Sequence, residues 1–144
     1  MNYQLNEGSI VVADTLTDRT MHVLAPKPGS ADFTVLISHD ELEPEEAYLD
    51  FIDRQLNDLA RQVNKFQQGP RGKAVLGAPK NGIEGVLLSI HYKQQGKFVY
   101  HQQAVFPFPD ERHLLTFTAS LPMPFGEQHL NQFHQMLSSF TPRR

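Results

Sequence analysis

The sequence predicts a single α+β domain: a largely antiparallel β-sheet with a long central helix and a C-terminal helix. Three observations support this fold class. Short segments rich in β-branched and aromatic residues lie on both sides of one long amphipathic segment. The end of the chain has a helical spacing of apolar residues. No repeat, low-complexity tract or composition shift divides the 144 residues, so residues 1–144 form one expected domain.

The first strands are expected at 9–13, 20–24 and 33–39, where β-branched and aromatic residues are frequent. Proline and glycine residues at 26–29 separate the second strand from the third. These short strands precede any helical pattern. The first quarter of the chain is therefore expected to consist of short strands.

The central helix is the strongest element in the sequence. Pro44 suits a first helical position, and the helix is expected to continue to about Lys65. Its apolar residues recur at intervals of four, four, three and four: Tyr48, Ile52, Leu56, Leu59 and Val63. This spacing predicts one apolar face. Gln55 lies on the shoulder of that face, where an amide can keep hydrogen bonding beside a buried surface.

The second half predicts more strands and a final helix. A strand is expected near 74–78, then a hairpin of 85–92 and 97–106 closed around Gln94-Gln95-Gly96, then a strand at 113–119. The C-terminal helix follows from the spacing of Leu130, Phe133, Leu137 and Phe140.

One face of this hairpin carries apolar and uncharged polar residues together. With the expected three-residue loop, that face holds these residues: Leu87, Ser89, His91, Val99, His101, Gln103 and Val105. A second helix layer would explain the mixture. A surface that a partner covers only part of the time would explain it equally well.

The composition excludes several classes of function. The chain has no cysteine, and its 13 basic and 16 acidic residues give a formal charge of −3. No basic patch indicates nucleic acid as a partner, and no apolar run approaches the roughly 20 residues of a membrane span. Residues 1–7 lack the features of a signal peptide, so we expect a cytoplasmic protein without stable membrane insertion.

No motif predicts catalysis, a cofactor or a metal site. The chain lacks a nucleophile elbow, a phosphate-binding loop and a dinucleotide fingerprint. Ser38, His39 and Asp40 are adjacent, whereas the members of a catalytic triad converge from separate positions. A small hydrolase or metal enzyme using His91 and His101 is the weakest alternative. We do not expect an enzyme.

Several segments resemble one known family. They are 3–7, 20–24, 35–40, 54–57, 96–97 and 103–106. Their order and spacing resemble the effector-associated (Eag) chaperones of bacterial type VI secretion, which belong to a DcrB-like group with a Mog1/PsbP-like fold. The resemblance extends from about Tyr3 to Phe140.

The resemblance implies a cytoplasmic homodimer that binds and shields the N-terminal hydrophobic helices of a secreted effector. Such a chaperone or adaptor aids loading of the effector onto the secretion spike, and a direct contact with the spike protein stays open. The client-binding positions of the family fall on Met21, Val23, Leu36, Gln55, Val63 and Gln103. The alternative is a protein-binding module of Mog1-like type that acts on a folded partner.

Overall fold

The computed structural model describes residues 1–108 and 112–143 and confirms the α+β class. The strands are β1 (Asn2–Gln4), β2 (Ser9–Val11), β3 (Met21–Leu24), β4 (Thr34–Glu41), β5 (Asn64–Gln68), β6 (Gly72–Leu76), β7 (Ile83–Gln94), β8 (Lys97–Pro107) and β9 (His113–Leu121). The helices are α1 (Tyr48–Gln62) and α2 (Glu127–Ser138). Strands β1 and β5 were not expected from the sequence.

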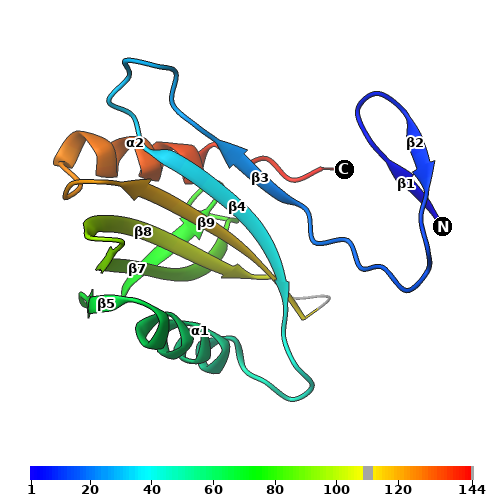
Figure 1. Cartoon of the computed structure of the whole chain (residues 1–144), viewed down its shortest axis with the longest axis horizontal. Coiled ribbons are helices and arrows are strands. Elements are labelled where there is room, and N and C mark those ends of the chain that lie inside the picture. The colour runs from blue at the N-terminus through cyan, green and yellow to red at the C-terminus, as the bar shows by residue number, and fades with distance from the viewer. Residues whose placement is uncertain (109–111, 144) are drawn as a thin grey trace.

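Seven strands form one antiparallel sheet in the order β3-β4-β9-β8-β7-β5, and β6 pairs with β7 beside β5. Strands β1 and β2 form a separate two-stranded hairpin. This hairpin lies well away from the large sheet (Figure 1). Strand β3 is therefore one open edge of the large sheet.

Each face of the large sheet carries one helix (Figure 1). On one face, Phe133 and Leu137 of α2 join a buried cluster that includes Phe106 and Leu121. On the other face, Phe51, Ile52 and Leu56 of α1 form a second cluster, which includes residues of β7. The second helix layer that the sequence left open is present, but α1 leaves part of its face uncovered.

Helix α1 is shorter at both ends than the sequence predicts. It begins at Tyr48 because the preceding segment turns: Glu45 has a left-handed φ of 64°, which a helix cannot contain. The Arg112 guanidinium donates hydrogen bonds to the carbonyl oxygens of Glu43 and Glu46 and stabilises this turn. At the other end, Lys65 has a φ of 55° and already belongs to β5.

The β7–β8 hairpin corrects the expected assignment of residues to faces. Gln94 pairs with Lys97, so the loop contains only Gln95 and Gly96, with φ angles of 51° and 79°. These positive values are typical of the tight turn that joins two adjacent strands. The loop is one residue shorter than predicted, and a shift of one residue moves a strand's side chains to the opposite face.

The observed register places Leu88 opposite Gln103 and Ile90 opposite His101. Val99, His101, Gln103 and Val105 therefore share the α1 face with the apolar residues of β7, whereas Leu87, Ser89 and His91 lie on the α2 face. The mixed face predicted from the sequence was thus assembled from residues of two opposite faces. On the face that α1 packs against, the β7 side chains are apolar and the β8 side chains are partly polar.

Candidate functional site

A groove lies between α1 and the sheet surface that α1 leaves uncovered. Its volume is about 390 Å³. We call it the α1 groove, and it is lined by Leu36, Arg54, Gln55, Leu56, Asp58, Leu59, Gln62, Ile90, His101, Gln103 and Thr118. One helix and four strands contribute to it, so the groove exists only in the folded sheet.

Strand register aligns the sheet side of the groove. Leu36 pairs with Thr118, Thr118 with Gln103, and Gln103 with Leu88. Paired residues of antiparallel strands point to the same face, so these side chains form one row across β4, β9, β8 and β7. Val23 of β3 pairs with Leu36 and extends the row to the open edge.

The groove is apolar at its base and uncharged along most of its walls. Leu56 and Ile90 are each 5% exposed and form part of the base. Amide and hydroxyl side chains follow along the walls, and the Gln103 Nε2 donates a 3.1 Å hydrogen bond to the Thr118 Oγ1. Arg54 and Asp58 are the two charged lining residues. Such a surface suits an apolar ligand that carries a few uncharged polar groups.

His101 lies partly buried in the groove wall. Its ring stacks on Tyr92 at 5.3 Å between centroids, and its Nε2 is 2.9 Å from the Tyr92 Oη. Its Nδ1 is buried and has no hydrogen-bond partner. Burial lowers the pKa of His101 below the ordinary value of 6.5. The neutral imidazole is therefore the stable form at neutral pH.

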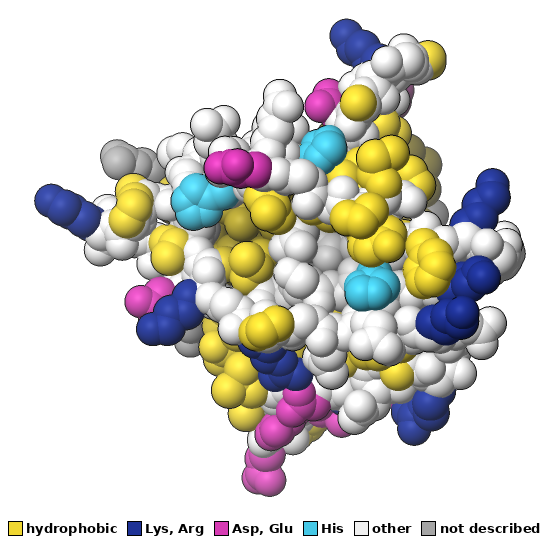
Figure 2. Space-filling model, turned by 90° about the vertical axis from the view of Figure 1, so that its left-hand side faces the viewer, with side chains coloured by type: hydrophobic (Ala, Val, Ile, Leu, Met, Phe, Trp, Pro, Cys, Tyr) yellow, Lys and Arg dark blue, Asp and Glu magenta, His cyan; other side chains and the backbone are white. Residues whose placement is uncertain are grey.

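The apolar surface continues from the groove to the sheet edge. Met21 and Val23 of β3 are 52% and 61% exposed, and their partners in β4 are Ser38 and Leu36. They thus share the face on which α1 packs. On the side of the molecule drawn in Figure 2, hydrophobic and uncharged side chains occupy the centre, and most Lys and Arg side chains lie toward the periphery.

Three of the six client-binding residues expected from the resemblance meet in the α1 groove: Leu36, Gln55 and Gln103. Met21 and Val23 lie beside the groove on the same face. Val63 is half-buried where α1 ends, and it is not among the described residues that line the groove. The structure therefore gathers five of the six positions on one face of the sheet.

Five polar lining residues were not among the expected client-binding positions: Arg54, Asp58, Gln62, His101 and Thr118. Gln62 is one helical turn beyond Asp58 and two beyond Gln55, so a helical wheel centred on Gln55 would have found it. His101 is two residues from Gln103 in β8, so strand alternation alone places both on one face. Thr118 could be found only from the register of β9, because it faces the groove through its pairing with Gln103.

The structure does not bring together the residues of the hydrolase or metal alternative. His91 and His101 lie on opposite faces of the hairpin, since His91 pairs with Tyr100 and His101 with Ile90. Ser38 and His39, being adjacent in β4, also point to opposite faces. Within residues 1–108 and 112–143, no three His, Asp or Glu side chains cluster as metal ligands.

A more polar hollow adjoins the α1 groove and shares Arg54 and Gln55 with it, and Arg19 and Asp40 are among its other lining residues. Burial raises the pKa of Asp40, while the positive charge of Arg19 opposes that shift. This hollow is distinct in character from the α1 groove. None of the described helices is both long enough and apolar enough to cross a membrane.

Comparison with known proteins agrees with this architecture. Residues 7–139 match the family model DcrB. The chain belongs to the DcrB family. The crystal structure of PA94, a protein of unknown function from Pseudomonas aeruginosa suggested to be a regulator, resembles this DcrB-family chain with a TM-score of 0.69 at 20% identity. The match covers 100% of this chain and 97% of PA94, and it shows a shared fold. No curated protein matches the chain.

The lowered pKa of the partly buried His101 predicts that the stability of the protein depends on pH. Because its pKa is lower in the folded protein than in the unfolded chain, the unfolded chain binds the proton first as the pH falls. The free energy of unfolding should therefore decrease below about pH 6.5, and His101→Gln should reduce this loss. Urea denaturation at pH 7.5 and 5.5 measures both effects. His134→Gln, a change of an exposed histidine, is the control and should retain the wild-type loss.

Proposed function

We propose that this DcrB-family protein is a cytoplasmic chaperone that binds apolar, transmembrane-type helices of a secreted effector along the α1 groove. One observation carries the proposal: a groove with an apolar base and amide-bearing walls continues into the exposed Met21 and Val23. The sequence resemblance to type VI effector-associated chaperones supports it. Family membership and the shared fold are consistent with it.

The chemistry of the surface selects the class of ligand. Burial of apolar surface contributes roughly 25 cal/mol per Å², so an apolar helix gains free energy by leaving water for this surface. A charged segment would lose hydration in the groove without finding a compensating ionic partner at its base. Gln55 and Gln103 offer both donors and acceptors, which can satisfy a serine, threonine or exposed backbone group of the client.

The open edge at β3 suits a ligand longer than the groove itself. A transmembrane-type helix of about 20 residues is about 30 Å long, so it would extend beyond the groove and contact more of the sheet face. Met21 is flexible and polarisable, which suits clients of differing shape. In the proposed role, the protein is a homodimer that holds the effector soluble before the effector is loaded onto the secretion spike.

Glutamate at the exposed edge tests the apolar contact. The double substitution Met21→Glu and Val23→Glu should weaken binding of a leucine-rich peptide of about 20 residues at least about tenfold, because each carboxylate would be buried unpaired. The thermal midpoint of the free protein should stay near that of wild type, since both side chains are exposed. Peptide binding is measured by fluorescence anisotropy in mild detergent.

His22→Glu is the matched control for that experiment. His22 lies between the two residues on β3, is exposed, and points to the opposite face. It should leave peptide affinity unchanged. Wild-type affinity in the double glutamate variant would exclude this edge from the binding surface, and unfolding of that variant would show that Met21 and Val23 belong to the core.

The glutamines test the polar part of the proposal. A neutral hydrogen bond contributes roughly 0.5–1.5 kcal/mol. Gln55→Ala or Gln103→Ala should therefore lower the affinity for a leucine-rich peptide with a central serine about three- to tenfold. The same substitutions should lower the affinity for a matched peptide with alanine in place of the serine by a smaller factor. If the double alanine variant and the wild type bind the serine peptide with equal affinity, Gln55 and Gln103 do not contribute to binding and the binding surface is purely apolar.

A further inference from the structure

The polar hollow beside the α1 groove has a volume of about 620 Å³. Three segments form most of its wall: residues 17–19 before β3, residues 39–41 at the end of β4, and the first half of α1. From α1, Arg54 and Gln55 line both the hollow and the groove, whereas Phe51, one turn earlier, lines only the hollow. The hollow therefore adjoins the groove at the end nearer the start of α1.

Acidic groups predominate in this hollow. Among the described residues, its charged lining consists of three carboxylates and two guanidiniums: Asp18, Asp40, Glu41, Arg19 and Arg54. The Arg54 guanidinium is already bound, because its Nε donates to the Glu46 Oε2 at 3.0 Å. Glu46 does not line the hollow, so a carboxylate from outside balances the charge of Arg54. Arg19 is left to oppose the three acidic groups.

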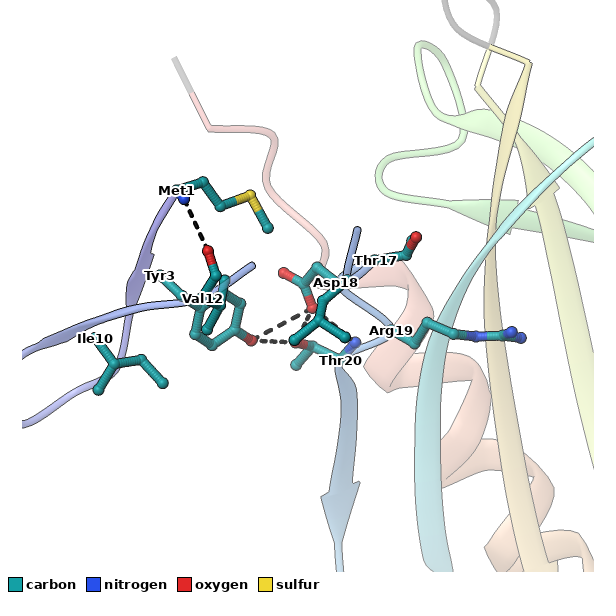
Figure 3. A pocket seen from close by; sticks show the side chains of 9 residues that line it. Met1, Tyr3, Ile10, Val12, Thr17, Asp18, Arg19 and Thr20 are labelled. Carbon is teal, nitrogen blue, oxygen red and sulfur yellow. Dashed lines mark hydrogen bonds between the residues drawn. The ribbon is translucent and has the colours of Figure 1, made fainter. Parts of the chain in front are cut away.

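The segment that carries Arg19 is fixed by its neighbour Asp18. The Asp18 carboxylate accepts hydrogen bonds from the Tyr3 Oη at 3.3 Å and from the Thr20 backbone N–H at 2.9 Å (Figure 3). The Arg19 side chain extends away from these groups, toward the large sheet (Figure 3). Arg19 makes no ion pair with any of the residues that the structure describes. Its charge therefore faces the hollow without a bound partner.

Asp40 is the half-buried carboxylate of the hollow. It lies four residues from Leu36 in β4, so both side chains are on the face that α1 covers in part. Its carboxylate makes no hydrogen bond or ion pair with residues 1–108 and 112–143. Burial raises the pKa of Asp40, and the positive charges of Arg19, His39 and Arg54 oppose that shift without contact. A cation in contact with Asp40 would recover hydration that this carboxylate has lost.

We infer that the polar hollow is a second subsite for the client, which binds a lysine or arginine side chain flanking the apolar helix, with Asp40 as its ionic partner. The inference rests on the proposed function, because it requires an apolar helix in the α1 groove. Two observations favour this occupant. The hollow is acidic and contains a carboxylate without a partner among the described residues, and it adjoins the apolar groove.

The chemistry of transmembrane-type helices fits this arrangement. Lysine and arginine are frequent beside such helices, in the loops on the cytoplasmic side. Their long apolar stems lie along apolar surface while the charged end reaches a polar site. An acidic flank would instead face Asp40 and Glu41, with Arg19 as the one unpaired guanidinium among the described lining residues.

The subsite would give the client a defined register. Apolar contacts in the α1 groove are not directional, so by themselves they allow a leucine-rich helix to slide along α1. An ion pair at one end of the groove fixes one position of the client and discriminates between clients with different flanks. Asp40 is thus a specificity-determining residue for the proposed client.

Three peptides test the subsite. Each has the same leucine-rich core of about 20 residues and ends at both sides in lysine, glutamine or glutamate. At pH 7.5 and low salt, wild type should bind the lysine peptide at least about threefold more tightly than the glutamine peptide. Asp40→Asn should lower the affinity for the lysine peptide to that for the glutamine peptide. Fluorescence anisotropy in mild non-ionic detergent measures these affinities.

Asp50→Asn is the matched control. Asp50 is an exposed acidic residue in the first turn of α1 and lines neither the hollow nor the groove, so the substitution removes the same charge elsewhere. It should keep the preference for lysine. The thermal midpoint of Asp40→Asn should not fall, because the amide has the size of the carboxylate and no charge to bury. A fall would show that Asp40 stabilises the fold through a partner of its own and would overturn the inference.

Arg19→Gln tests the sign of the charge that the hollow binds. Arg19 repels a bound lysine and attracts Asp40, so its removal should increase the preference for the lysine peptide. Tightest binding of the glutamate peptide, lost in Arg19→Gln, would overturn the inference in favour of an anion site. Equal affinity of wild type for all three peptides would overturn the subsite and leave the α1 groove in place. Failure of every peptide to bind would overturn the proposed function itself, and the subsite with it.

Discussion

The two-residue turn at Gln95 and Gly96 fixes the chemistry of both faces of the sheet. By pairing Gln94 with Lys97, it places Gln103 opposite Leu88 and His101 opposite Ile90. The polar residues of β8 therefore lie among the apolar residues that α1 covers. With one more residue in the loop, the same side chains would face α2, and the α1 groove would have a different wall.

The α1 groove also requires that α1 cover only part of the sheet face on which it packs. The segment before α1 is held by Arg112, which donates to carbonyl oxygens of Glu43 and Glu46, and by the Arg54–Glu46 ion pair at 3.0 Å. Phe51, Ile52 and Leu56 anchor the helix over β7 and β8. The surface near Leu36 and Thr118, toward β4 and β9, is left as one side of the groove. If helical structure covered the whole of this sheet face, the groove would be filled and the sheet would be buried between two complete helical layers.

Most elements could be predicted from local patterns. The apolar period of α1 and α2, the β-branched segments and the tight turns all act within a few residues, and the structure contains each of these elements. The ends of α1 could not be read in this way. Pro44 favours a helix start, yet Arg112, distant in sequence, stabilises a turn there, and Glu45 adopts a left-handed conformation. Strand β5 was missed because its apolar content is one partly buried residue, Phe66.

The candidate site was predictable in part. Gln55 was identified from its place on the helix shoulder, and Leu36 and Gln103 from the resemblance. Their meeting in one groove depends on register across four strands, which a sequence pattern does not specify when the loop length is uncertain by one residue. The three-residue loop expected from the sequence also placed His91 and His101 on the same face, which suggested a metal or catalytic pair. The observed register separates them.

The central claim is that an apolar helix binds between α1 and the β3 edge. Hydrogen–deuterium exchange of the full chain, with and without the leucine-rich peptide, tests it most directly. The account predicts slower exchange in α1 and in β3 and β4, with α2 unchanged. Slower exchange confined to α2, or none at saturating peptide, would contradict it.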